Sequence, residues 1–385
     1  MKSAQQVDIQ LFTHDSSFKD QLCRLFKYTK SCSLPRLWVK QVRRSCLRTI
    51  RKGALMDINE LVVSSLKNNH GFESPIWTVE NAAKYAATGA DLSEWDRLVS
   101  EEILHLMTSL NQEGVDRVDL CAAPCGQGAL GQLLRAVADD LVELVGQDRL
   151  HYVELGPEPI KTCALMRHLL ENGAEPLHYT AVDINQASHG VMRRSVEPLL
   201  AAPQGFRYLS TDFRSLYRRH IDCGQDVTLI TMLGFQEGNE LPDTIGQILR
   251  RIGGARTYVL SEMQLSTAQG DEHIQRFYRH DCMYRFSDLI GIKLGFQKTG
   301  EHEVVVSEIE HGVDRYRVAA TLLPVSKGSA QGYLLTNVCL KYTREQFTRV
   351  RQEYGGCRVI GEYCSGDGSV LFQLSEYCAD HAAVN

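Results

Sequence analysis

The sequence predicts an α/β fold in which a doubly wound, mostly parallel sheet is closed by an antiparallel hairpin. Apolar, β-branched runs alternate with helical stretches from residue 116 to residue 263, a pattern typical of a parallel sheet with helices on both faces. The runs are VDRVDLC, LHYVELG, LHYTAVDI, FRYLSTDF, VTLITMLGF and RTYVLSEM. Near the C-terminus, CRVIGEYC and SVLFQL flank the turn Ser365-Gly366-Asp367-Gly368 and predict the closing hairpin.

The composition indicates a globular chain. Its 385 residues, 43% hydrophobic and 23% charged, can bury a large core. A net charge of -5 argues against general nucleic-acid binding, although residues 21–56 hold ten Lys or Arg and no Asp or Glu. We interpret this basic segment as a solvated face of a helical region, with an RNA-binding or membrane-surface arm or a transit peptide as alternatives.

The cysteines and the hydropathy indicate the compartment. Twelve cysteines without a C-x-x-C pair are expected to be free thiols in a reducing compartment. The closest pairs, Cys121 with Cys125 and Cys357 with Cys364, lack further ligands at metal-binding spacing, so no metal is expected. No apolar run is long enough to span a bilayer, and the N-terminus lacks a signal-peptide core. We therefore expect a cytoplasmic protein with no membrane partner.

Four segments are expected along the chain: an N-terminal helical region (1–115), the sheet core (116–263), an insertion (264–336) and the C-terminal part of the core (337–385). One helix of the first segment, expected to cap a site, has an apolar stripe of Trp95, Leu98, Val99, Ile103, Leu106, Met107 and Leu110. In the insertion, two strand-like runs joined around His311-Gly312 predict an antiparallel hairpin. Thr343 with Gln346 predicts a capping box at a later helix.

Acidic residues end three successive strands of the predicted core. Glu154 and Gly156 follow the first strand, and glycine lets the main chain approach a ligand closely. Asp183 ends the next strand, where a carboxylate can accept hydrogen bonds from ribose hydroxyls. Asp212-Phe213 ends the third and suits the amino group and flat face of adenine. Because doubly wound sheets bind ligands at the carboxyl ends of their strands, the three together predict a nucleoside site.

A second glycine-rich turn lies upstream, in DLCAAPCGQGALGQLL. There Asp119, Gly126, Gly128 and Gly131 also follow an apolar run, and by glycine count this is the better nucleotide-binding fingerprint. We prefer the turn at Gly156, because only from there do the next two strands end in acids at workable spacing. The alternative for the upstream glycines is a tight turn between a strand and a helix.

Five runs follow one another within residues 150–375: ELGPEPIKTCALMRHLL, YTAVDIN, TDF, LGFQEGN and TNVCLKYTREQF. In order and spacing they resemble the histidine-specific S-adenosylmethionine (SAM)-dependent methyltransferase family of ergothioneine biosynthesis. The resemblance implies a Rossmann-like core that binds SAM, with a substrate domain built from the N-terminal helices and the insertion. The residues it implies for the SAM pocket are Glu154, Gly156, Lys161, Asp183, Asp212 and Phe213.

The resemblance also implies an acceptor site. Asn239 matches an asparagine that holds the backbone groups of the substrate amino acid, and Tyr278 corresponds loosely to a tyrosine of the same pocket, so both are candidate catalytic residues. By themselves, Asn239 is a turn residue after Gly238 and Tyr278 a half-buried helix aromatic. Asn337 and Cys339 stand where the family has a glutamate and a serine that read imidazole. Because an amide and a thiol replace these groups, histidine is not the expected substrate.

The glycine loop also departs from the family pattern, since it is one residue shorter and has Pro157-Glu158 in place of a second small-residue step. The sequence therefore predicts a divergent SAM-dependent methyltransferase of secondary metabolism. Its expected partner is an amino acid or an amino-acid-derived amine. The alternatives are O- or C-methylation, chemistry on the aminobutyryl arm of SAM, and a non-catalytic binding protein with a degenerate pocket.

Overall fold

The computed structural model describes residues 57–85, 94–117, 130–174 and 176–378. All of them belong to one unit, which spans Asp57–Asn385. The basic segment at residues 21–56 lies outside the described residues. So do Asp119, Gly126 and Gly128 of the upstream glycine turn, and most of the strand expected before it.

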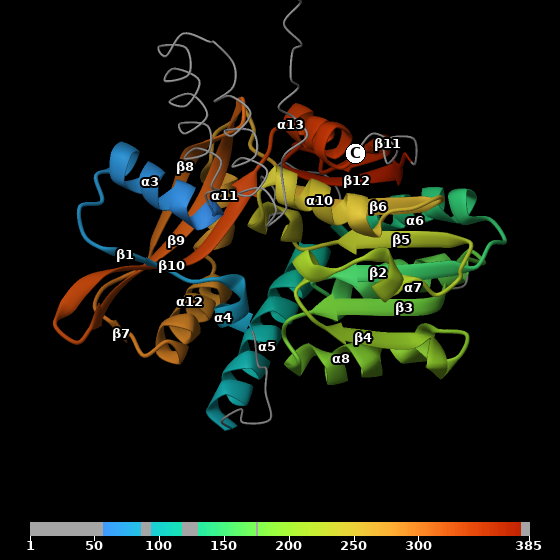
Figure 1. Ribbon diagram of the computed structural model, residues 1–385, viewed down its shortest axis with the longest axis horizontal. Helices are drawn as coiled ribbons and strands as arrows, with labels where there is room; N and C mark the ends of the chain where they lie inside the picture. The colour runs from blue at the N-terminus through green and yellow to red at the C-terminus, as the bar shows by residue number, and fades with distance from the viewer. Residues whose placement is uncertain (1–56, 86–93, 118–129, 175, 379–385) are drawn as a thin grey trace, which may run out of the picture. The chain divides into compact units, whose positions relative to one another are not determined.

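The core is a seven-stranded sheet with the order β11-β12-β6-β5-β2-β3-β4 (Figure 1). Its strands are β2 (Leu150–Leu155), β3 (Pro176–Asp183), β4 (Phe206–Ser210), β5 (Val227–Met232), β6 (Thr257–Gln264), β11 (Cys357–Cys364) and β12 (Val370–Tyr377). The strands from β2 to β6 pair in parallel, whereas β12 runs antiparallel to both β6 and β11. The predicted Rossmann-like, doubly wound sheet with a closing hairpin is confirmed.

Helices cover both faces of this sheet, which is why its central strands are buried along their whole length. Every residue of β2 and β5 is buried. Tyr152 packs in one core cluster with residues of α6 (Leu130–Val145), α7 (Pro159–Glu171) and α8 (Ala187–Val196). Val153 belongs to another cluster, with α9 (Arg218–Ile221) and α10 (Pro242–Ile252). Strands buried on both faces form continuous apolar runs, and these runs made the core strands predictable.

A second sheet stands beside the core within the same unit. Its strands are β1 (Ile76–Thr78), β7 (Gln297–Lys298), β8 (Glu303–His311), β9 (Asp314–Lys327) and β10 (Ala330–Lys341). The hairpin predicted around His311-Gly312 is confirmed, because β8 and β9 pair antiparallel up to this turn. The expected boundary between residues 336 and 337 falls inside β10. This strand pairs with β9 on both sides of that boundary, so it belongs to the second sheet and not to the core.

The remaining helices include α5 (Glu94–Asp116), which packs against α12 on one side and α7 and α8 on the other. Its buried stripe contains Val99, Ile103 and Leu110, whereas Leu98 is 47% exposed and does not belong to it. The helix runs through Asp116, where a strand was expected, because Val115 continues the apolar face onto the main core. The other helices are α3 (Ile58–His70), α4 (Asn81–Tyr85), α11 (Glu272–Tyr278), α12 (Asp281–Lys293) and α13 (Arg344–Arg349).

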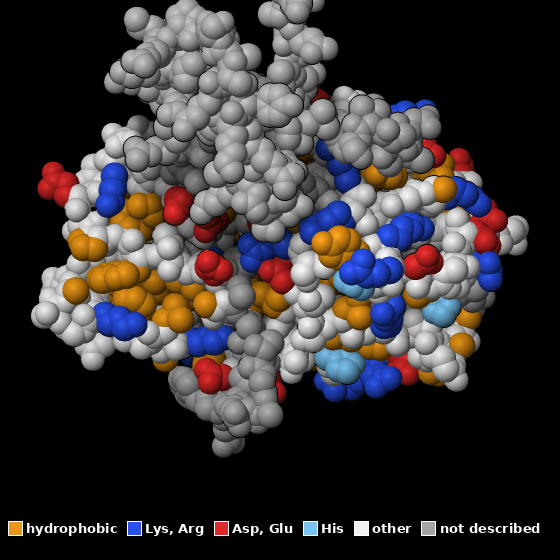
Figure 2. All heavy atoms as spheres, in the orientation of Figure 1, with side chains coloured by type: hydrophobic (Ala, Val, Ile, Leu, Met, Phe, Trp, Pro, Cys, Tyr) orange, Lys and Arg blue, Asp and Glu red, His pale blue; other side chains and the backbone are white. Residues whose placement is uncertain are grey.

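Short helical turns and the surface complete the described structure. Thr343 and Gln346 form the predicted capping box at α13. The 3-10 turns η3 (Glu197–Leu199) and η4 (Pro203–Gly205) connect α8 to β4. The described cysteines are free thiols, and in the described ranges no helix has the length and apolarity to cross a membrane. Figure 2 shows Lys and Arg side chains interspersed with Asp and Glu over the described part of one face.

Candidate functional site

A pocket lies where the loops after β2, β3, β4 and β5 meet β10 and α5. β2 pairs with β3 on one side and with β5 on the other, so the chain connections diverge at this point. Doubly wound sheets bind their ligands at such a switch point, outside the carboxyl ends of the strands. Nine of the ten predicted site residues line the pocket: Gly156, Lys161, Asp183, Asp212, Phe213, Asn239, Tyr278, Asn337 and Cys339.

Glu154 is the predicted site residue that the structure does not bring into the pocket. Alternation along β2 turns its side chain to the same face as Tyr152, beneath α7. The carboxyl group is fully buried and accepts hydrogen bonds from Thr162 Oγ1 (2.6 Å) and from the Tyr179 hydroxyl (2.6 Å). Burial raises the pKa of Glu154 to about 8, so the neutral acid predominates at pH 7. Its expected role in the SAM pocket is therefore wrong.

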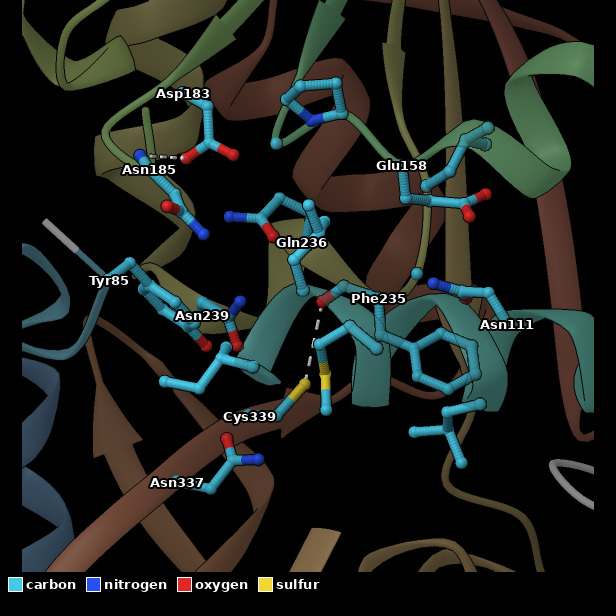
Figure 3. Close-up of a pocket in the computed structure, with 18 of the residues that line it drawn as sticks. Tyr85, Asn111, Glu158, Asp183, Asn185, Phe235, Gln236, Asn239, Asn337 and Cys339 are labelled. Atoms are coloured by element: carbon cyan, nitrogen blue, oxygen red, sulfur yellow. Dashed lines mark hydrogen bonds between the residues drawn. The ribbon is translucent and has the colours of Figure 1, made fainter. Parts of the chain in front are cut away.

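Gly156 brings the main chain against the side chain of Gln236, which belongs to η6 (Gln236–Asn239). Gly156 has a φ of +71°, in the left-handed region that favours glycine. A Cβ atom at this position would lie only 2.8 Å from Cδ of Gln236. Figure 3 shows Gln236 projecting into the space between Asp183 and Asn239. The glycine thus makes room at the point where the β2 loop and the β5 loop meet.

Charged side chains fix the loop that follows Gly156. Glu158 caps α7 by accepting hydrogen bonds from the backbone N–H groups of Ile160 (2.9 Å) and Lys161 (2.6 Å). The Lys161 ammonium group donates to both carboxylate oxygens of Glu262, at 2.8 and 2.7 Å. Glu262 also accepts from the N–H of Gly234 (2.6 Å). Lys161 therefore lines the pocket as half of a buried ion pair that ties α7 to β6 and to the loop after β5.

Asp183, at the end of β3, retains acceptor capacity toward the pocket. Its carboxylate accepts from the backbone N–H of Asn185 (2.9 Å) and from the Ser188 hydroxyl (3.4 Å; Figure 3 shows the first bond). Burial raises the pKa of Asp183 to about 6. The backbone N–H of Ile184 also donates to it. A carboxylate has about four lone-pair positions, so acceptor capacity remains for a hydroxyl group of a ligand.

The loop after β4 brings Asp212, Phe213 and Arg214 to the pocket. Asp212 caps η5 (Phe213–Ser215) by accepting from the backbone N–H of Arg214 at 2.8 Å. Its second oxygen accepts from Arg214 Nε at 2.9 Å. The carboxylate is thus largely engaged by Arg214, and the half-buried ring of Phe213 offers the flat surface here.

The turn after β5 packs directly on the second sheet. Phe235 has a φ of +62°, a left-handed conformation that costs a residue with a Cβ about 1–2 kcal/mol. Such backbone strain concentrates at functional sites. A Cβ on Gly238 would lie 2.6 Å from Sγ of Cys339, so only glycine permits this approach to β10. Figure 3 shows Asn239, Cys339 and Asn337 on the same side of the pocket.

A buried ion pair fixes the turn after β5. Arg351, on the π-helical turn η7 (Val350–Tyr354), donates to Glu237 Oε2 at 2.5 Å and to Ser261 Oγ at 2.8 Å. The Arg351 and Glu237 side chains have no exposed surface. A buried charge that loses its partner is strongly destabilising, so the pair fixes the turn between Gln236 and Asn239.

Another wall of the pocket is formed by β10 and α11. The register of β10 shifts just before Asn337, and Asn337 and Cys339 then face the pocket together. Lys341 is fully buried two residues further on, with Nζ 3.4 Å from Sγ of Cys339. Its ammonium group lies 4.7 Å from the ring centre of Phe235 and 4.9 Å from that of Tyr278. The aromatic and thiol groups of this wall therefore surround a buried positive charge.

Sequence reasoning missed several polar residues of the pocket: Tyr85, Asn111, Asn185, Arg214, Gln236 and Glu240. Asn111 belongs to α5, the helix that was expected to cap a site. Gln236 lies in the run LGFQEGN and Glu240 directly follows it, so their closeness in sequence to the predicted Asn239 was the available signal. Tyr85 follows no motif. In the described part of the chain, no group of three or more His, Cys, Asp or Glu side chains could hold a metal ion.

No family model and no curated protein matches the chain, so membership of the histidine-specific family stays a hypothesis. Solved structures of methyltransferases do match. A SAM-dependent methyltransferase from Clostridium acetobutylicum has 10% identity and a TM-score of 0.37, covering 70% of this chain and 97% of that one. The sugar N-methyltransferase KedS8 from a Streptoalloteichus species has 12% identity and a TM-score of 0.32, covering 64% and 87%. The amino pentose methyltransferase CalS10 from Micromonospora echinaspora has 13% identity and a TM-score of 0.33, covering 65% and 92%. At these scores nothing about activity is carried over, and the fold class rests on the strand order.

Proposed function

We propose that the protein is a SAM-dependent methyltransferase acting on the amine of an amino acid or amino-acid-derived small molecule other than histidine. The observation that carries this proposal is one pocket with two kinds of wall. Residues suited to a nucleoside lie at the strand ends, and amide, thiol and phenol groups face them from β10, α11 and the β5 turn. The doubly wound sheet closed by a hairpin, which is usual in such enzymes, supports the proposal.

The residues at the strand ends fit a nucleoside donor. Gly156 lets the loop after β2 pass directly against the Gln236 side chain, where a Cβ atom would clash, and so keeps the main chain close to the pocket. Asp183 has lone pairs for the ribose hydroxyls, and the Phe213 ring can lie against adenine. Lys161 has a different role in our account, because Glu262 engages its ammonium group; it fixes the loops around the donor and does not neutralise a ligand carboxylate.

SAM, when bound, supplies a methyl group that its positive sulfur already activates. The chain must therefore hold the acceptor atom in line with this methyl group and keep water out. On α5, Ile103, Met107 and Leu110 present apolar side chains to the pocket and would exclude water. Asn239 and Tyr278 would orient the acceptor, Asn239 through its amide and Tyr278 through its ring or hydroxyl.

The side chains on β10 argue against histidine as the acceptor. Asn337 has a neutral amide and Cys339 a weakly polar thiol at the positions where the resembling family reads imidazole. A site built for a polar group discriminates strongly, and it loses this discrimination when its donors and acceptors are replaced. The pocket therefore favours an acceptor whose side chain makes fewer or different hydrogen bonds.

The test is product analysis with the full chain. The protein is incubated with SAM and a panel of amino acids and amines, and the products are identified by mass spectrometry. We expect S-adenosylhomocysteine and an acceptor carrying one or more new N-methyl groups. Methylthioadenosine would instead indicate use of the aminobutyryl arm, and methylation of oxygen or carbon would indicate the other alternative.

Two variants control this experiment. Asp183→Ala removes the proposed ribose ligand and should abolish SAM binding and turnover. Asp139→Ala removes an exposed carboxylate of α6 and should leave both unchanged. Turnover of histidine alone contradicts the proposed acceptor, and SAM binding without any turnover favours a non-catalytic binding protein.

A further inference from the structure

Glu240 is a buried carboxylate of the pocket that the steps above do not use. The residue is 8% exposed and lines the pocket beside Asn239. Among the described residues its carboxylate makes no hydrogen bond, and its one ion-pair contact is Arg214 Nε, 3.9 Å from Oε1. Buried polar groups in proteins are nearly always hydrogen-bonded. The position is therefore suited to an N–H donor that belongs to a ligand.

The charged groups facing Glu240 do not already neutralise it. They are Arg214, Asp212, Asp57 and Lys84. Asp212 engages Arg214 more closely than Glu240 does, at 2.7 Å. Burial lowers the pKa of Lys84 to about 8, and its charge is shared with Asp57. Desolvation raises the pKa of Glu240 to about 7, which makes the carboxylate a base that works near neutral pH.

Glu240 also lies between the two walls of the pocket. It directly follows η6, the turn that Gly238 packs onto β10, on the acceptor side. On its other side is Arg214, which belongs to the loop after β4, on the donor side. Glu240 thus connects the turn that carries Asn239 with the loop after β4 and lines the pocket between them.

We propose that Glu240 binds the acceptor as an ammonium ion and takes the proton that its nitrogen must lose. The inference rests on the proposed methyl transfer and narrows the acceptor to a basic aliphatic amine, which is cationic at neutral pH. An ammonium nitrogen has no lone pair, so its N–H bond must first break, with the proton going to a Glu240 oxygen. The freed lone pair then forms the N–C bond to the methyl group as the C–S bond breaks, and that electron pair stays on sulfur.

The same carboxylate disfavours the other acceptor classes. A neutral phenol or carbon acid offers the carboxylate no positive charge, and an acceptor that arrives as an anion would be repelled by it. An ammonium ion is attracted instead, and the charge-assisted hydrogen bond is the stronger kind. Glu240 therefore favours N-methylation over O- or C-methylation in this pocket.

The experiment uses Glu240→Gln, which keeps the size of the side chain and removes its charge and basicity. Its matched control is Glu310→Gln on β8, where the side chain is 76% exposed. Binding of S-adenosylhomocysteine is measured by calorimetry. The melting temperature of the S-adenosylhomocysteine complex is then measured with tyramine, tryptamine, histamine and agmatine, and with their parent amino acids. The kcat/KM of the best amine is followed from pH 5.5 to 9.

We expect at least one amine to raise the melting temperature of the wild-type complex. Glu240→Gln should bind S-adenosylhomocysteine within about threefold of wild type and lose the effect of the amine. It should lose about 100-fold or more in kcat/KM, the usual contribution of a general base, together with the pH limb near 7. Glu310→Gln should behave as wild type.

Three results would overturn the inference: no amine stabilises the wild-type complex, Glu240→Gln keeps the wild-type kcat/KM and pH profile, or Glu240→Gln loses tenfold or more in S-adenosylhomocysteine affinity. The last would make Glu240 a ligand of the nucleoside. If Glu240→Gln does not fold, the melting temperatures of the wild-type complex still show whether the pocket binds amines. Failure of the wild-type protein to bind S-adenosylhomocysteine would contradict the methyltransferase proposal itself.

Discussion

Substitution of Gly156 by alanine tests the turn on which the donor side of the pocket depends. The added Cβ would lie 2.8 Å from Cδ and 2.9 Å from Oε1 of Gln236, about 1 Å inside the usual contact distance between carbon atoms. The Gln236 side chain, which lines the pocket, would have to move. The left-handed φ of +71° adds about 1–2 kcal/mol of strain for any residue with a Cβ atom.

Gly173→Ala separates these two effects. Gly173 has a φ of +84°, but nothing lies within 4 Å of a Cβ added there. Both variants should lose about 1–2 kcal/mol in the free energy of unfolding, measured by urea denaturation. Only Gly156→Ala should bind S-adenosylhomocysteine about tenfold more weakly or worse, measured by calorimetry. The double variant Gly156→Ala with Gln236→Ala should recover part of this affinity. Wild-type affinity in Gly156→Ala would contradict the role given to this turn.

The remaining predictions concern charged groups. Because the pKa of Asp183 is raised to about 6, the affinity of the wild-type protein for S-adenosylhomocysteine should fall as the pH drops below 6. Asp183→Asn should bind weakly at every pH. A wild-type affinity that does not change with pH would contradict this prediction. Burial raises the pKa of Glu154 from 4.5 to about 8. Between these pH values the unfolded chain ionises this acid and the folded protein does not, so the free energy of unfolding falls as the pH rises from about 4.5 to 8. Urea denaturation should show this loss in wild type but not in Glu154→Gln, which should still bind S-adenosylhomocysteine; parallel pH profiles would count against it. Arg351→Met leaves the carboxylate of Glu237 buried without its partner and should cost about 3–5 kcal/mol in unfolding free energy. Arg315→Met, where the side chain is 72% exposed, should change it by less than about 0.5 kcal/mol, and equal losses would refute this prediction.

The core could be predicted from the sequence because its central strands are recognisable as local apolar runs. A strand buried on both faces is a short apolar run wherever it lies, and the order of such runs with helices between them fixes a doubly wound topology. The expected boundary between residues 336 and 337 divided β10 and placed its last five residues in the core, for the same reason. Its run YLLTNVCLKY is apolar in either sheet, and its pairing with β9 is a contact that local patterns do not record.

The pocket, too, could be predicted from the sequence only in part. Acids at strand ends located the edge of the sheet where the pocket lies, but the face to which each side chain turns depends on alternation along the strand. Glu154 therefore lies beneath α7, although Asp183 lines the pocket. Gln236 and Glu240 enter the site because Gly238 allows the β5 turn to pack on β10. No periodicity in the sequence records this contact.

The most direct test of the central claim is a calorimetric titration of the full chain with S-adenosylhomocysteine. We expect saturable binding to one site per chain, which is lost in Asp183→Ala and retained in Asp139→Ala. An absence of binding, or binding that survives Asp183→Ala unchanged, would contradict the assignment of this pocket to SAM.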